Sequence, residues 1–190
     1  MTNRPVALVT GATRGIGRAI AVELSSTHRI LVGGRDASRA GALVAELGDA
    51  APFVCDLADE DAVAAACAGI GRLDVLVHSA GIGRSNDIGV AYRALWREVF
   101  ETNVFAVADL TRLLLPALEA ARGIVVAINS GAGFFSSPGG GVYAGSKFAL
   151  RALTDALREE MRGKVRVCSV HPGRTDADMQ RELQAAMGNK

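Results

Sequence analysis

TGATRGIG, at residues 10–17, joins the first apolar run of the chain to a segment with helical spacing. Its glycines follow a G-xxx-G-x-G spacing. That spacing supplies glycine where a chain turns tightly, where backbone approaches a pyrophosphate and where a helix packs on a strand. The N-terminus of the following helix would attract the anion. This turn therefore predicts a nucleotide-binding crossover, with a simple tight strand-to-helix turn as the competing interpretation.

Strand-like and helix-like segments alternate from this turn outward. Short apolar runs predict six strands buried on both faces, at residues 6–9, 29–33, 52–55, 73–77, 123–128 and 164–170. Helical spacing lies between them at 15–26, 38–47, 59–68, 92–121 and 143–162. Because parallel strands need right-handed helical crossovers, this order predicts a doubly wound α/β fold of the Rossmann type, in one domain over residues 1–190.

Composition narrows the classes of partner. The 190 residues are 49% hydrophobic, and 21 basic against 20 acidic side chains leave a net charge of +1. Such a chain can fill one sizeable core, but it has no overall field to hold a polyanion or an anionic membrane. We therefore expect neither nucleic acid nor a membrane as partner.

The cysteines indicate a reducing compartment. Cys55, Cys67 and Cys168 are odd in number and form no CxxC or His/Cys cluster, which argues against a disulfide framework and a metal site. No apolar run approaches the ~20 residues of a spanning helix, and no cleavable signal pattern precedes the first strand. We expect a cytoplasmic protein that holds no metal.

The end of the second predicted strand, Val32-Gly33-Gly34-Arg35-Asp36, bears on cofactor choice. An acidic side chain here suits the ribose 2′-hydroxyl of NAD, whereas an arginine suits the 2′-phosphate of NADP. Gly34 leaves the acidic position empty, and Arg35 follows it, with Arg14 available from the glycine-rich turn. This favours NADP(H) over NAD(H), although both arginines could be solvated surface residues and Asp36 could neutralise Arg35.

A third group of residues points to proton transfer. Tyr143 and Lys147 are four positions apart and share one helix face. A nearby ammonium is expected to lower the pKa of the phenol, so that it exchanges a proton near neutral pH. Reduction of a ketone or oxidation of an alcohol requires that exchange. Ser130, at the end of the fifth predicted strand, could donate a hydrogen bond to the same oxygen.

Asn103 falls on an apolar helical stripe, formed by Leu95, Val99, Ala106, Leu110 and Leu113. A buried carboxamide must find hydrogen-bond partners. For a lone buried asparagine, satisfying backbone groups is the simpler interpretation.

These motifs occur in one register. TGATRGIG, the Asn103-Val104 pair, Ser130 thirteen positions before Tyr143, and Tyr143-Ala-Gly-Ser-Lys147 together resemble the short-chain dehydrogenase/reductase family. The resemblance covers residues 6–179 and is to the NADP-preferring type. It implies that Tyr143 is the general acid or base, that Lys147 lowers its pKa and binds the nicotinamide ribose, and that Ser130 orients the substrate carbonyl. Asn103 would hold a water that links Lys147 to solvent.

The resemblance also implies a set of cofactor contacts. Asp56 matches an adenine-binding aspartate, with a turn or N-cap role as the competing interpretation. The implied NADP(H)-binding residues are Gly11, Thr13, Arg14, Gly15, Ile16, Gly17, Arg35, Asp56, Leu57, Ser79, Ala80, Gly81, Tyr143, Lys147, Pro172, Gly173 and Thr175.

The sequence departs from the family at three places. The usual Asn-Asn-Ala-Gly is His78-Ser79-Ala80-Gly81 here, and we interpret His78 as a supported core histidine. After Pro172-Gly173, Ala177 replaces a threonine and Thr175 replaces an aliphatic residue. The chain ends at Lys190, so we expect six strands without the family's usual C-terminal strand.

The resemblance implies an NADPH-dependent carbonyl reductase or alcohol dehydrogenase that forms a homodimer or homotetramer through the helices at 92–121 and 143–162. Phe134, Phe135, Trp96 and Val142 could line a pocket for a fairly apolar ketone, aldehyde or secondary alcohol, or could be ordinary core residues. Two other functions stay open: a 3-oxoacyl thioester reductase of fatty acid or polyketide synthesis, and a non-catalytic NADP(H)-binding sensor or scaffold.

Overall fold

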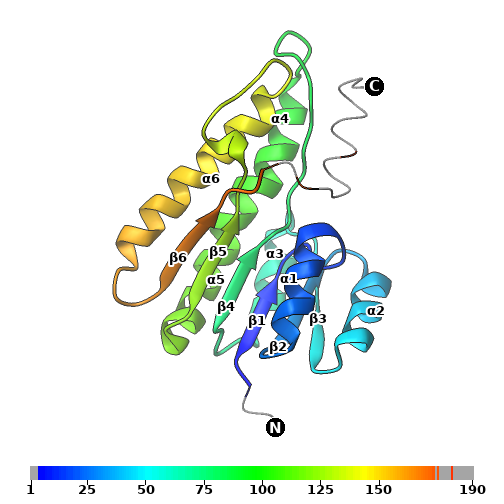
Figure 1. Cartoon of the computed structure of the whole chain (residues 1–190), viewed down its shortest axis with the longest axis vertical. Coiled ribbons are helices and arrows are strands. Elements are labelled where there is room, and N and C mark those ends of the chain that lie inside the picture. Colours follow the sequence, from blue (N-terminus) through cyan, green and yellow to red (C-terminus); the bar gives the residue numbers. More distant parts are fainter. Residues whose placement is uncertain (1–3, 174, 176–180, 182–190) are drawn as a thin grey trace.

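The computed structural model describes residues 4–173, 175 and 181, which form a parallel β-sheet with helices packed against both faces (Figure 1). Within these residues the sheet has six strands in the order β3-β2-β1-β4-β5-β6. The strands are β1 (Val6–Val9), β2 (Arg29–Gly34), β3 (Ala50–Val54), β4 (Val75–His78), β5 (Ile124–Ile128) and β6 (Arg166–Val170). The predicted doubly wound α/β fold is confirmed, and each predicted strand forms within two residues of its expected bounds.

The helices occupy the predicted intervals with one exception. They are α1 (Gly15–Ser25), α2 (Ala37–Leu47), α3 (Glu60–Cys67), α4 (Arg93–Phe100), α5 (Ala106–Ala121) and α6 (Gly141–Glu160). The single helix expected over 92–121 is wrong, because a π-helical turn, η1 (Glu101–Phe105), separates α4 from α5. A short 3₁₀ turn, η2 (Gly131–Gly133), follows β5.

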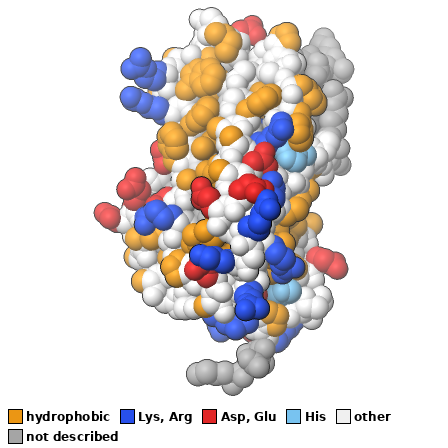
Figure 2. Space-filling view, turned by 90° about the vertical axis from the view of Figure 1, so that its left-hand side faces the viewer, with side chains coloured by type: hydrophobic (Ala, Val, Ile, Leu, Met, Phe, Trp, Pro, Cys, Tyr) orange, Lys and Arg blue, Asp and Glu red, His pale blue; other side chains and the backbone are white. Residues whose placement is uncertain are grey.

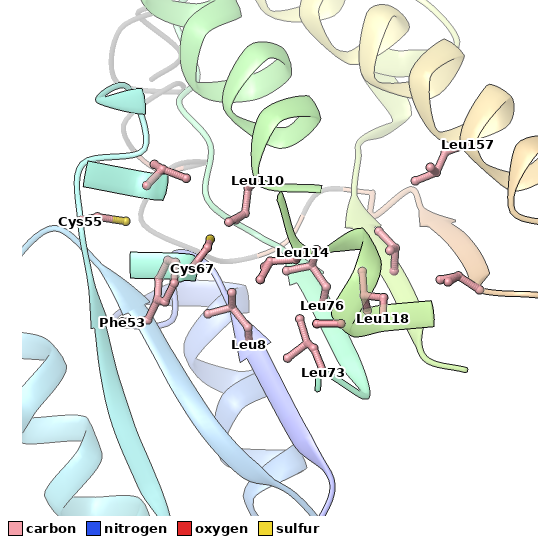
Figure 3. Packing of buried hydrophobic residues seen from close by; sticks show 14 residues of the cluster. Leu8, Phe53, Cys55, Cys67, Leu73, Leu76, Leu110, Leu114, Leu118 and Leu157 are labelled. Atoms are coloured by element: carbon pink, nitrogen blue, oxygen red, sulfur yellow. The ribbon is translucent and has the colours of Figure 1, made fainter. Parts of the chain in front are cut away.

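Two apolar cores hold the layers together, one on each face of the sheet. The first packs leucines of α5 and residues of α3 and α6 against β1 and β4, and Figure 3 shows Leu110, Leu114 and Leu118 beside Leu8 and Leu76. The second packs α1 and α2 against the opposite face, through Ala7, Val9, Ala21, Ile30, Val32, Ala40, Leu43 and Val77. Successive strand residues therefore face different cores, which explains why the strands are apolar at nearly every position.

The strand register brings two loops together at one edge of the sheet. Val9 pairs with both Val32 and Val77, and the Thr10 amide donates to the Val77 carbonyl at 2.9 Å. The chain leaves β1 toward β2 on one side and leaves β4 toward β5 on the other. The loops after β1 and β4 therefore flank the switch point where open α/β sheets bind ligands.

The surface of the α6 side carries hydrophobic side chains mainly in its upper half and charged ones in its middle and lower parts (Figure 2). Among the described residues, no helix combines the length and apolar character needed to cross a bilayer. Cys55, Cys67 and Cys168 are free thiols.

Candidate active site

The glycine-rich turn is shaped by close backbone contacts. Gly11 has a φ of +63°, and a Cβ there would lie 2.9 Å from the backbone of Ala80. A Cβ on Gly17 would lie 2.3 Å from the Gly11 carbonyl oxygen, so no larger residue fits. Helix α1 begins after Arg14 without a side-chain cap. The first amides of α1 thus face the space above the turn, where a phosphate would find donors.

Thr10 connects this turn to the loop after β4. Its buried hydroxyl accepts hydrogen bonds of 3.1 Å from the amides of both Ser79 and Ala80, and it donates to the Val77 carbonyl oxygen at 3.3 Å. The sequence analysis missed this residue. The signal was its place as the first residue of TGATRGIG, directly after a buried strand.

One cavity of about 490 Å³ lies above the carboxyl ends of the strands. It is lined by every residue that the family resemblance assigned to NADP(H) binding, from Gly11 to Thr175, and also by Ser130. Residues from both halves of the chain therefore surround one space. The later family threonine position, Ala177, lies outside the described residues.

The wall of the cavity near the end of β2 carries Arg35 and Arg39, together with Asp36. Gly34 packs against Thr13, because a Cβ on Gly34 would lie 3.0 Å from the Thr13 methyl group. Asp36 caps α2 by accepting from the Arg39 amide at 3.1 Å, and it pairs with the Arg39 side chain at 3.4 Å. Asp36 thus pairs with Arg39, and the interpretation that it also neutralises Arg35 stays open.

Asp56 takes part in a turn and also lines the cavity. Its Oδ1 accepts from the Ala58 amide at 3.1 Å, while the N-cap of α3 is Asp59. Turn formation and a ligand contact are compatible here, because the second carboxylate oxygen still has acceptor capacity.

Ser130, Tyr143 and Lys147 meet at the inner end of the cavity. Ser130 caps η2, where its Oγ accepts from the Ala132 amide at 3.1 Å, and its side chain is close enough to Tyr143 to affect the pKa of that phenol. The Lys147 Nζ lies 5.7 Å from the centre of the Tyr143 ring and donates to the Ile128 carbonyl oxygen at 3.0 Å. Lys147 is only 5% exposed.

Burial governs the ionisation of this group. It raises the pKa of Tyr143 above its usual value, while the polar side chain of Ser130 lowers it in part. Burial also lowers the pKa of Lys147 to about 8. The expected net lowering of the Tyr143 pKa by Lys147 is therefore not found, because desolvation of the phenolate outweighs the favourable interactions. The phenol holds its proton at neutral pH.

Asn103 lies in the π-helical turn and is fully engaged. Its Oδ1 accepts from the Ile82 amide, and its Nδ2 donates to the Ile82 carbonyl, both at 2.9 Å. The second Nδ2 hydrogen goes to Ser146 Oγ at 3.0 Å, and that hydroxyl donates to the Tyr143 carbonyl at 2.7 Å. The expectation that this buried carboxamide finds partners is confirmed. Ser146 was missed by the sequence analysis, although it stands directly before Lys147.

Asn129 is a third residue that the sequence analysis missed. It is buried, its Oδ1 accepts from the Ser130 amide at 2.9 Å, and its Nδ2 donates to the Lys147 carbonyl at 3.2 Å. One side chain thus fixes the backbone of Ser130 and of Lys147 relative to each other. Its position between β5 and Ser130 was the available signal.

His78 is a supported core histidine, as expected. Its Nε2 lies 2.9 Å from Thr111 Oγ1, and that hydroxyl donates its own hydrogen to the Val107 carbonyl oxygen at 2.7 Å. The Nε2 atom must therefore carry the hydrogen of this pair. Complete burial lowers the pKa of His78 to about 4.

The aromatic and apolar residues expected around the substrate divide into two groups. Val142 is fully buried with Leu95 and Val99, and Trp96 packs on that cluster, so neither lines the cavity. Phe134 and Phe135, after Ser130, are 52% and 67% exposed. Neither of these two lines the cavity either.

Taken together, the fold and the cavity define a class of protein. The family model described as short chain dehydrogenase matches residues 5–188, and the chain belongs to this family. Members are oxidoreductases that bind a nicotinamide cofactor, and this chain is an enzyme of that class.

Individual relatives share most of the chain. The serine 3-dehydrogenase of Agrobacterium fabrum is 38% identical over 180 residues, which cover 90% of this chain and 72% of the relative. The 3-oxoacyl-[acyl-carrier-protein] reductase FabG of Pseudomonas aeruginosa is 34% identical over 192 residues, which cover 95% of this chain and 78% of the relative. The crystal structure of a metagenomic short-chain oxidoreductase in complex with NADP superposes with a TM-score of 0.84 at 35% identity, over 97% of this chain and 89% of that one.

Proposed function

We propose that the protein is an NADPH-dependent carbonyl reductase that acts on fairly apolar ketones or aldehydes, with Tyr143 as general acid. One observation carries the proposal: a single cavity places the nucleotide-type residues of the TGATRGIG turn and the Ser130–Tyr143 pair around the same space. Asp56, Leu57 and the loop at 79–81 would contact the adenosine side. Pro172, Gly173 and Thr175 would contact the nicotinamide side.

The residues present fit the cofactor. The open N-terminus of α1, together with the glycine positions that exclude a Cβ, leaves room and donors for a pyrophosphate. When bound, the reduced nicotinamide supplies the hydride that the substrate carbon receives. Lys147, close to Tyr143 at the inner end, would hold the nicotinamide ribose.

Proton transfer is the work of this chain's own residues. Because burial raises the pKa of Tyr143, the phenol is protonated at neutral pH and can donate to a carbonyl oxygen as that oxygen gains charge. The Ser130 hydroxyl, next to the same phenol, would donate a second hydrogen bond to that oxygen.

In this proposal Asn103 acts by holding neighbouring elements of the site in place. Both hydrogens of its amide are donated to Ile82 and Ser146, so the side chain fixes the π-helical turn against α6. The water relay from Lys147 toward solvent, implied by the family resemblance, remains a prediction.

The choice of NADP(H) rests on Arg14 and Arg35, which both line the cavity, and on the engagement of Asp36 by Arg39. A 2′-phosphate would give these arginines a doubly charged partner. The test compares the affinities of NADPH and NADH in the wild type, in Arg35→Ala and in the control Arg166→Ala. Arg166 begins β6, so it lies at the end of the strand away from the cavity. Equal affinities for both cofactors in all three proteins would refute this preference.

The proposed reaction is tested by following NADPH oxidation with benzaldehyde, acetophenone and 2-decanone, and NADP⁺ reduction with L-serine. We expect turnover with at least one apolar carbonyl. The similarity to FabG favours a second candidate, a 3-oxoacyl thioester reductase, so the acetoacetyl thioester of N-acetylcysteamine joins the panel. Tight NADPH binding without any turnover would instead support a sensor or scaffold.

We also propose that the protein is a cytoplasmic homodimer or homotetramer with a single domain, in keeping with its three free thiols. Phe105 and Phe148, on η1 and α6, are 52% and 44% exposed on neighbouring helices. Apolar side chains exposed together favour association. Analytical ultracentrifugation at micromolar concentration should give a dimer or larger, and a monomer would contradict this.

A further inference from the structure

His171 connects the turn at Ser130 to the chain that leaves β6. Its Nδ1 lies 2.9 Å from the Ser130 carbonyl oxygen, and its Nε2 lies 3.0 Å from Ser169 Oγ. A carbonyl oxygen only accepts hydrogen bonds, so Nδ1 carries a hydrogen and donates it to Ser130. In the neutral ring, Nε2 then accepts from the Ser169 hydroxyl.

The same ring also holds the loop after Ser130. It packs on the Phe134 ring, with the ring centres 4.4 Å apart, and the Arg151 guanidinium lies 4.4 Å from the centre of the Phe134 ring. A cation, an aromatic ring and an imidazole are thus in successive contact from α6 to Ser130. Phe134 is thereby fixed beside the site, although it is half exposed.

Backbone hydrogen bonds flank this side-chain contact. The Asn129 amide donates to the Val170 carbonyl at 2.8 Å, and the Gly131 amide donates to the Pro172 carbonyl at 3.2 Å. The His171 bond to Ser130 lies between them. Three consecutive residues after β5 are therefore fastened to the segment that ends in Pro172 and Gly173.

We propose that His171 is a positioning residue, which holds the Ser130 backbone in register with Pro172 and Gly173. The inference rests on the proposed function, in which Ser130 meets the substrate carbonyl and the Pro172 segment meets the nicotinamide. If the Nδ1 donor is lost, the Ser130 carbonyl loses this bond, and Ser130 can shift relative to Tyr143 as far as the bonds of Asn129 and Gly131 allow. Turnover should then suffer more than cofactor binding, because the binding turn at 10–17 is not involved.

Three substitutions separate the two contacts of the ring. Asparagine can place a donor near the Nδ1 position, glutamine near the Nε2 position, and phenylalanine keeps the ring without either hydrogen bond. We expect His171→Asn to retain kcat within about 3-fold, and His171→Gln and His171→Phe to lose about 10-fold, the worth of one hydrogen bond. The Kd for NADPH should change by less than about 2-fold in each, since the glycine-rich turn at 10–17 is not altered.

Turnover is measured with the best carbonyl of the panel, next to Tyr143→Phe and to the surface control His28→Asn. Equal kcat values for His171→Asn and His171→Gln would overturn the inference, and so would a wild-type kcat in His171→Phe. Thermal unfolding identifies any variant that fails to fold, and the Asn and Gln pair then decides. Undiminished activity in Tyr143→Phe would instead refute the proposed function.

A second measurement does not depend on turnover. Long-range ¹H–¹⁵N NMR of the imidazole ring reports which nitrogen of neutral His171 carries the hydrogen. We expect the Nδ1–H tautomer, and the Nε2–H tautomer would overturn the inference even if the enzyme is active.

Discussion

The side chain of Asn103 donates a hydrogen bond of 3.0 Å to Ser146 Oγ, and so joins the π-helical turn to the helix that carries Tyr143 and Lys147. Ser146 is fully buried and passes its own hydrogen to the Tyr143 carbonyl oxygen. The position of Tyr143 therefore depends on a residue 40 positions earlier in the sequence. A π-helical turn suits this task, because its extra residue redirects a side chain that a regular helix would leave in the apolar stripe.

We predict that Ser146→Ala lowers kcat about 10-fold and the free energy of unfolding by ~1–2 kcal/mol, because Asn103 loses a buried acceptor. The Kd for NADPH should stay unchanged. Steady-state kinetics and urea unfolding check this. The matched control is Thr154→Val, since the Thr154 hydroxyl is also buried on α6 and bonds only within that helix, to Leu150 and Arg151. A loss of kcat in the control as large as that in Ser146→Ala would contradict the prediction.

The close packing of the glycine-rich turn gives a second prediction. Gly17→Ala should abolish NADPH binding and cost about 2 kcal/mol or more of stability, because its Cβ would lie 2.3 Å from a backbone oxygen. Gly41→Ala, at an exposed position of α2 with nothing within 4 Å of the new Cβ, should stabilise the protein by ~0.5–1 kcal/mol. Isothermal titration with NADPH and thermal unfolding of both variants test the contrast. Tight NADPH binding by Gly17→Ala would show that this turn is not the cofactor site.

The positions of the strands and helices along the chain could be predicted from the sequence because both follow local patterns. Buried parallel strands are short apolar runs, and their crossovers show helical spacing, so the sheet was recovered within two residues per strand bound. The π-helical turn was not predicted, because one extra residue in a helix changes the apolar spacing too little to be seen over a segment of this length.

The site was predicted only in part, because only some of its residues have a fixed local spacing. Tyr143, Lys147 and the glycines have fixed spacings, but Thr10, Asn129 and Ser146 act through bonds to distant backbone or side chains. No local pattern encodes those contacts. The direction of the Tyr143 pKa shift was also wrong, since it depends on burial by residues from several elements and not on the spacing to Lys147.

The buried Lys147 ammonium destabilises the folded state, which can be measured. Its folded pKa of about 8 lies below its ordinary value of 10.5. Below pH 8 this lysine is protonated in both the folded and the unfolded state, so the full free-energy cost of the buried charge applies. Between pH 8 and 10.5 the unfolded state binds more protons, so the free energy of unfolding rises with pH.

We therefore predict that Lys147→Met is inactive yet more stable than the wild type at pH 7. The expected gain in the free energy of unfolding is ~2 kcal/mol, once the lost hydrogen bond to Ile128 has been subtracted. This advantage should shrink as the pH rises from 8 to 10.5. Urea unfolding of both proteins at pH 7 and pH 10 gives the comparison. An advantage that grows toward pH 10 would contradict the assignment.

The buried His78 gives a prediction for the acidic end of the pH range. Its pKa falls from 6.5 to about 4 on burial, so the unfolded state binds more protons between these values. The wild type should lose up to ~3 kcal/mol relative to His78→Asn as the pH falls from 6.5 to 4. Guanidinium unfolding across this range tests the difference, with His28→Asn as control. A difference between wild type and His78→Asn that is independent of pH would refute it.

The central claim is that the Tyr143 phenol transfers the proton, and Tyr143→Phe tests it most directly. The substitution removes one oxygen and leaves the ring in place. The control is Tyr92→Phe, since Tyr92 is 66% exposed. The measurement is kcat for NADPH-dependent carbonyl reduction, with NADPH affinity determined on the same samples. We predict a loss of at least about 10²-fold in kcat for Tyr143→Phe, the usual contribution of a general acid, with NADPH affinity retained and Tyr92→Phe unaffected. Turnover by Tyr143→Phe at the wild-type rate would contradict the account.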